Sequence, residues 1–363
     1  MYLKTLTELD GISGNEETVS SYIMDICNPF LDLSRDSMYI DKLGNLIIFK
    51  KGTMNHRDKN DRNFRVMLCS HMDEIGLLIT GHTDKGALRF RPVGAIDVKI
   101  LPGMCLAVGE KHLSGVVGLK PLHLKKKEEG DKQIECKDLY IDIGAATKEE
   151  ALAAVGKGEY AGFISEYEEY GKNRVKSKAL DDRSGCCVLI EILKEHFEFD
   201  LYLCFSVQEE IGLRGAETAA YVIEPDIAVI VEGTTCSDIL GVEIQDYATV
   251  SGEGAALTIK DNGTIPDKKL SGLIAVTADK YKIKMQYRQT TAASNDAASI
   301  QGSRKGVKVA ALSIPCRYIH SPNSILDKRD LDSCRELLNK FLHELEKDKC
   351  TLLFSLIGGT SND

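Results

Sequence analysis

Five short apolar runs of this chain are each followed by a carboxylate or a histidine. In an open α/β sheet, ligands bind in the crevice outside the carboxyl ends of the strands. If the runs are strands of one such sheet, we expect their polar ends to supply the chemistry of a single site. The runs are Arg65–Cys69 before His71, Asp73 and Glu74; Val175–Leu180 before Asp181 and Asp182; Leu201–Val207 before Glu209 and Glu210; Ile227–Val231 before Glu232; and Val307–Ile314 before His320.

Strands and helices alternate from about residue 172 to the end of the chain. Helices are predicted at 184–197, 266–282 and 330–347, the last with one apolar face. This alternation predicts an α/β fold with a mixed, mostly parallel sheet flanked by helices. The stretch before residue 72 fits the same domain, because Asn15 is a candidate helix cap and 45–49 reads as a strand.

The middle of the chain has a different pattern. Short β-like segments there are separated by Gly, Pro and Asp, without a long helical period. We therefore predict a small all-β barrel at 73–171, inserted into a discontinuous catalytic domain of residues 1–72 plus 172–363. The predicted barrel strands are Gly76–Thr80, Leu88–Pro92, Met104–Val108, Leu113–Leu119 and Leu139–Ile143.

Composition narrows the possible partners and the compartment. The 363 residues carry a net charge of -9, which argues against nucleic acid or an anionic membrane as the main partner. No apolar stretch approaches about 18 residues, and residues 1–8 lack a signal-peptide pattern. The 11 cysteines are odd in number and lack CxxC spacing, which favours reduced, buried thiols. We expect a soluble cytoplasmic protein.

The polar ends of the runs also have ordinary explanations. A histidine after a strand is usually structural, but Asp73 lies two positions after His71 and could orient its imidazole. Asp181-Asp182 precedes a helix, where one aspartate would serve as a cap and the other would be left to face the crevice. Glu209-Glu210 could be exposed, yet the pair follows a run that must be buried, and a bend at Ile211-Gly212 would bring both into one site.

Oxygen and imidazole ligands without thiolate suit zinc, cobalt or manganese, with zinc favoured. Two such ions lower the pKa of a bridging water and polarise a carbonyl. A glutamate that is not needed as a ligand could take the proton of that water and pass it to a leaving amine. Hydrolysis of an amide is the reaction class that this set of residues predicts.

The chain resembles the TET-type, or deblocking and glutamyl, metallo-aminopeptidases, which share a catalytic domain with other co-catalytic zinc exopeptidases. The resemblance covers nearly the whole length and rests on eight segments in the right order. These are Gly11–Glu16, Ser70–Gly76, Arg91–Gly94, Gly118–His123, Tyr140–Gly144, Ala179–Gly185, Gln208–Gly212 and Arg317–Pro322.

The resemblance implies a role for each site residue. Asp181 would bridge two metal ions, His71 and Glu232 would complete one site, and Glu210 and His320 the other. Glu209 would be the general base, and Asp73 would orient His71. The family also implies a cis peptide bond between Asp181 and Asp182. Many relatives carry aspartate at position 232, where this chain has the longer glutamate.

The resemblance also implies an activity and an assembly. The protein would release the N-terminal residue from short peptides, and the barrel would mediate dimers that can build a hollow tetrahedral dodecamer. Residues 252–256 and 294–297 depart from the family pattern near the substrate pocket and subunit contacts. The preferred N-terminal residue stays open.

Two alternatives stand beside the aminopeptidase. A glycoside hydrolase needs two carboxylates, and some relatives have been labelled endoglucanases, but this chain has no Trp to build a sugar platform. A metal-stabilised assembly protein without catalysis is the other, and the intact Glu209 argues against it.

Overall fold

The computed structural model describes residues 2–53, 63–124 and 133–347. A large mixed sheet runs in the order β1-β2-β12-β3-β13-β16-β17-β11-β10, and β14 joins β16 and β15. The central strands β12, β3, β13 and β16 are parallel neighbours. The strands are β1 Ser37–Ile40, β2 Leu46–Lys50, β3 Arg65–His71, β10 Glu168–Tyr170, β11 Arg174–Ser177, β12 Asp200–Ser206, β13 Ile227–Thr235, β14 Ala255–Thr258, β15 Met285–Arg288, β16 Lys308–Arg317 and β17 Ser324–Asp327.

Helices cover both faces of this sheet, as predicted. Side chains of α1, α2, α4, α6 and α8 join the core on one face, whereas those of α5 and α7 join the core on the other. Residues of β13 alternate between the two cores, as the period of two in a strand requires. The helices are α1 Leu3–Glu8, α2 Glu17–Cys27, α3 Lys148–Ala154, α4 Leu180–Ile192, α5 Arg214–Ile223, α6 Lys268–Tyr281, α7 Asp296–Gln301 and α8 Lys328–Lys347.

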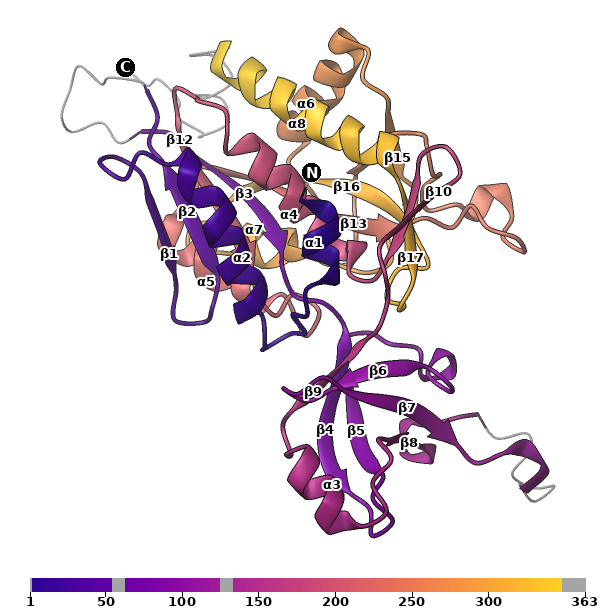
Figure 1. Ribbon diagram of the computed structural model, residues 1–363. Coiled ribbons are helices and arrows are strands. Elements are labelled where there is room, and N and C mark those ends of the chain that lie inside the picture. The colour runs from indigo at the N-terminus through magenta and orange to yellow at the C-terminus, as the bar shows by residue number, and fades with distance from the viewer. Residues whose placement is uncertain (1, 54–62, 125–132, 348–363) are drawn as a thin grey trace.

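A closed barrel is inserted between β3 and β10 (Figure 1). It has its own apolar core, including Leu77, Phe90 and Ile141. Its strands follow the order β4-β5-β8-β7-β6-β9, which confirms the predicted β-barrel. The strands are β4 Gly76–His82, β5 Leu88–Val93, β6 Cys105–Val108, β7 Leu113–Leu119, β8 Leu139–Asp142 and β9 Tyr160–Phe163. The domain boundaries at 72/73 and 171/172 stay predictions.

One sequence prediction near the N-terminus is wrong. Asn15 does not cap α2, because the residue before the helix is Glu16 and no side-chain cap bond is made there. The backbone N–H of Asn15 instead donates to Ile12 at 2.7 Å, within a tight loop. The side chain of Asn15 is exposed.

All ten cysteines among the described residues are free thiols, and eight of them are buried. Within the described residues, no helix has the length and apolar character needed to span a membrane.

Candidate active site

Four of the predicted ligands lie near the carboxyl ends of the central strands, whereas Asp181 lies at the start of α4, after β11, which pairs antiparallel with β17. His71 is the last residue of β3, and Glu209 and Glu210 follow β12. Glu232 lies within β13 rather than after it, because that strand continues to Thr235. His320 follows β16 in a turn and has a positive φ of 57°.

Asp181 lies between the two histidines. Its Oδ1 is 3.3 Å from Nε2 of His71, and its Oδ2 is 3.5 Å from Nε2 of His320. Nε2 of His320 is also 3.5 Å from Oε2 of Glu210. Donor atoms of His71, Asp181 and Glu210 all lie within 4.8 Å of one another. Each oxygen of Asp181 therefore faces a different imidazole.

The two aspartates of the pair do different things. The Asp181-Asp182 peptide bond is cis, as the resemblance implied, and both residues have non-helical dihedral angles at the start of α4. Asp182 turns into the protein, where it accepts from Ser70 Oγ at 2.5 Å and from the Gly185 N–H at 2.9 Å. Asp182 thus serves the helix start and leaves Asp181 for the cluster.

Gly233 allows β13 to approach Asp181 closely. Its N–H donates to Asp181 Oδ1 at 3.2 Å. A Cβ atom on Gly233 would lie 2.7 Å from that same oxygen, closer than such contacts occur. The absence of a side chain at position 233 is therefore a condition for the observed pose of Asp181.

Glu209 and Glu210 lie in a loop and not on a strand. The chain turns earlier than the predicted bend at Ile211-Gly212, because β12 ends at Ser206 and Gln208 has a φ of 56°. A positive φ is uncommon for a residue other than glycine and is held by its surroundings. The loop in this conformation places both glutamates beside the cluster. Oε2 of Glu209 lies 4.0 Å from Nε2 of His71.

Asp73 links His71 to this loop. Nδ1 of His71 lies 3.3 Å from Oδ1 of Asp73 and 3.2 Å from its carbonyl oxygen. The same carboxylate accepts the N–H groups of Glu209 at 3.0 Å and Glu210 at 3.1 Å. A fixed hydrogen bond to one ring nitrogen sets the tautomer and leaves the other nitrogen free to bind a metal.

Glu232 has a partner that the sequence reasoning missed. Its Oε1 accepts from Asn295 Nδ2 at 2.5 Å and lies 3.4 Å from Ser313 Oγ. Asn295 directly precedes α7, where its own Oδ1 accepts the Ala297 N–H. Only the departure of residues 294–297 from the family pattern could have drawn attention to it.

The ionisable side chains of the cluster have shifted pKa values. Burial raises the pKa of Glu209 and Glu232, and it raises that of Glu210 to about 7. Burial alone would lower the pKa of His320, but Asp181 and Glu210 raise it to about 9. Burial opposes ionisation of Asp181 too, yet His320 and His71 hold its pKa below the usual value.

Such a set of largely buried carboxylates is costly unless it is paired or bound to metal. Carboxylate and imidazole donors at this spacing suit zinc, cobalt or manganese. The residues therefore fit a metal centre.

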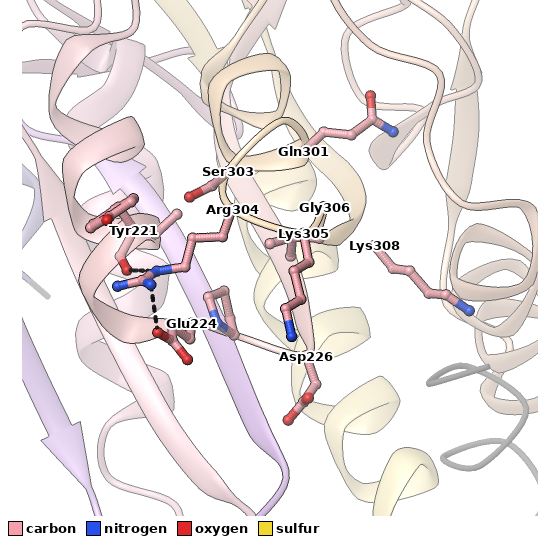
Figure 2. Close-up of a pocket in the computed structure, with 12 residues that line it drawn as sticks. Tyr221, Glu224, Asp226, Gln301, Ser303, Arg304, Lys305, Gly306 and Lys308 are labelled. Carbon is pink, nitrogen blue, oxygen red and sulfur yellow. Dashed lines mark hydrogen bonds and ion pairs between the residues drawn. The ribbon is translucent and has the colours of Figure 1, made fainter. Parts of the chain in front are cut away.

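A separate cavity of about 1110 Å³ lies between the end of α5 and the loop after α7 (Figure 2). Arg304 there stands 3.8 Å from the ring centre of Tyr221 and pairs with Glu224 at 2.9 Å. None of the predicted site residues lines this cavity.

Comparison with known proteins identifies the family of this chain. The sequence model of the M42 glutamyl aminopeptidase family matches residues 44–337 of this chain. This chain belongs to the M42 glutamyl aminopeptidase family. As an M42 family member it is a hydrolase, a metallo-aminopeptidase.

Relatives of this M42 chain agree over nearly their whole lengths. A lysyl aminopeptidase of Pyrococcus furiosus is 33% identical, over 95% of this chain and 96% of the relative. The solved structure of an aminopeptidase from Desulfurococcus kamchatkensis is 34% identical with a TM-score of 0.90, covering 99% and 98%. The TET1 peptidase of Pyrococcus horikoshii, 34% identical with a TM-score of 0.80, covers 94% and 98%.

M42 membership decides between the predicted activities. The family and these relatives are peptidases, so the aminopeptidase prediction is confirmed and the glycoside hydrolase is not retained. An assembly protein without catalysis is not retained either.

Proposed function

We propose that this chain is a dinuclear aminopeptidase that releases the N-terminal residue from short peptides. His71 and Glu232 would hold one ion, Glu210 and His320 the other, and Asp181 would be shared. The observation that carries the proposal is the position of Asp181, whose two oxygens face two different histidines at 3.3 and 3.5 Å. A carboxylate that binds two ions must present its oxygens in this way.

Two divalent ions held there would polarise the scissile carbonyl and make water a nucleophile at neutral pH. Glu209 takes one proton from the attacking water and delivers it to the leaving amine as the C–N bond breaks. Its raised pKa suits a group that must both accept and return a proton. Asp73 holds the imidazole of His71 and the Glu209-Glu210 loop in one arrangement.

We also propose a homo-oligomer in the cytoplasm. The TET1 peptidase of Pyrococcus horikoshii is described as assembling into a tetrahedron or a large octahedral shell. The inserted barrel is the element that would mediate a dimer, and a dodecamer would restrict entry to short peptides. Sedimentation of the purified chain tests this part.

The activity is tested on the metal-free protein reloaded with zinc, cobalt or manganese. A panel of aminoacyl anilides then reports the reaction, the preferred N-terminal residue and the active metal. We expect Glu209→Gln to lower kcat by about 10²–10⁴ while the metal content stays unchanged. Glu217→Gln, an exposed glutamate of α5, is the matched control. Full activity of Glu209→Gln would refute the proposed base.

A further inference from the structure

The segment Gly11–Glu16, a motif without an assigned role, lies directly behind the catalytic residues. We call residues 11–16 the N-terminal loop and residues 208–210 the catalytic loop. Ser13 and Glu16 are 3% and 7% exposed, so their polar side chains are buried and need hydrogen-bond partners within the protein.

Ser13 reaches the catalytic loop through Asp73. Its hydroxyl donates to Asp73 Oδ2 at 2.6 Å, the same oxygen that accepts the Glu210 N–H. The other oxygen accepts the Glu209 N–H and faces His71. The hydroxyl of Ser13 thereby fixes the rotation of a carboxylate that positions three members of the site.

Glu16 reaches the catalytic loop directly. Its Oε1 accepts the Gln208 N–H at 3.1 Å and the Gly14 N–H at 2.8 Å. Gln208 is the residue with positive φ that turns the chain into Glu209. A hydrogen bond at this position opposes relaxation of the turn.

The N-terminal loop is itself anchored. The Ser13 N–H donates to the Glu74 carbonyl at 3.2 Å, and the Glu74 N–H donates to Gly11 at 3.0 Å. The hydroxyl of Tyr160, from barrel strand β9, stands over Gly14, where an added Cβ would lie only 2.8 Å from it. The loop is thus held on both the sheet side and the barrel side.

From these contacts we propose that Ser13 and Glu16 are positioning residues that set the geometry of Glu209 and Glu210 from outside the metal cluster. The inference rests on the proposed role of Glu209 as the base. Two independent side chains act on one three-residue loop, so losing either one moves the base relative to the reacting water. A misplacement of about 1 Å can cost about 100-fold in rate.

The test compares Ser13→Ala, Glu16→Ala and Glu16→Gln with Glu17→Ala, an exposed acid next in sequence. We expect both positioning alanine variants to lower kcat about ten- to a hundredfold, with KM and metal content little changed. Glu16→Gln keeps the accepting oxygen and should recover most of the kcat lost in Glu16→Ala. The double alanine variant should lose less than the product of the single losses, because both side chains act on one loop.

Wild-type kcat in both alanine variants overturns the inference. A loss that follows the unfolding midpoint, without recovery by Glu16→Gln, also overturns it by indicating a purely structural role. Ser13→Ala removes one oxygen only and serves as the test if Glu16→Ala does not fold. Glu209→Gln is measured in parallel: if it stays active, the proposed function fails, whereas an inactive Glu209→Gln beside active Ser13 and Glu16 variants refutes only this inference.

Discussion

Asp181 depends on the backbone that surrounds it. The Asp181-Asp182 peptide bond is cis, Asp182 is bound to Ser70 and Gly185, and Gly233 leaves room beside Oδ1. The contacts of Asp182 and the space beside Gly233 direct the Asp181 carboxylate between the two histidines. The pose of the Asp181 carboxylate is therefore specified by its neighbours as much as by its own side chain.

Gly233→Ala tests this close approach. The new methyl would overlap Asp181 Oδ1, so we expect metal affinity and kcat to fall at least about tenfold. Gly272→Ala in α6 is the matched control, because nothing lies within 4 Å of its added Cβ. There we expect a protein of unchanged activity that is more stable by up to about 1 kcal/mol. Isothermal titration with zinc and steady-state kinetics measure both variants, and equal behaviour of the two would contradict the argument.

Asn295→Ala tests the support of Glu232. Without the Nδ2 donor, Oε1 of Glu232 loses its 2.5 Å hydrogen bond and the carboxylate can rotate. Loss of such a partner typically weakens metal binding about 10- to 100-fold. Competition with a chromogenic chelator measures the affinity, and the exposed Asn262→Ala is the control. Unchanged affinity would show that Asn295 does not support Glu232.

At the level of single residues, the sequence was informative where a polar residue followed an apolar run. It placed all seven predicted site residues in one region, and the structure brings them together. It could not find Asn295, because the contact between Glu232 and Asn295 depends on how α7 packs beside β13. Nor could it locate the turn at Gln208, whose positive φ is held by tertiary contacts and not by its residue type.

At the level of elements, periodicity predicted the long helices and the positions of the main strands along the chain. The helix expected at 330–347 is observed at Lys328–Lys347 with a buried apolar face. The short α3 and the four-residue strand β9 were missed, since so few residues carry no clear period. The start of α4 was placed too late, because Asp181 and Asp182 interrupt the helical dihedral angles.

Phe341→Ala in α8 tests the packing of that helix. Phe341 is fully buried in the larger core, so its truncation leaves a cavity and should lower the free energy of unfolding by about 3–5 kcal/mol. Chemical denaturation at a fixed protein concentration measures the change. Glu336→Ala, on the exposed face of the same helix, should change it by less than about 0.5 kcal/mol. A cost below about 1 kcal/mol for Phe341→Ala would contradict the observed packing.

At the level of the whole molecule, the β-rich middle of the sequence was separable from the α/β part because their patterns differ. Which residues of the barrel approach the active site was not predictable, since Tyr160 and Gly14 are far apart in the chain. The same junction contains Glu16, a buried acid that links the barrel side of the molecule to the catalytic loop. We therefore expect the ionisation of Glu16 to change the free energy of unfolding of the whole protein.

Burial raises the pKa of Glu16 from 4.5 to about 7. The hydrogen bond from the Gly14 N–H lowers this pKa, and the charge of Asp73 raises it further. Because the pKa of Glu16 is higher in the folded state, the stability that this side chain contributes is fully present below pH 4.5. It is lost as the pH rises through about 7. Relative to Glu16→Gln, which does not titrate, the metal-free wild type should lose up to about 3 kcal/mol of unfolding free energy across this window. Urea denaturation of both proteins in chelator, at several pH values from 4.5 to 8, measures the difference. The Glu17→Gln control should keep the wild-type slope, and a constant difference between wild type and Glu16→Gln would show that Glu16 is not the group responsible.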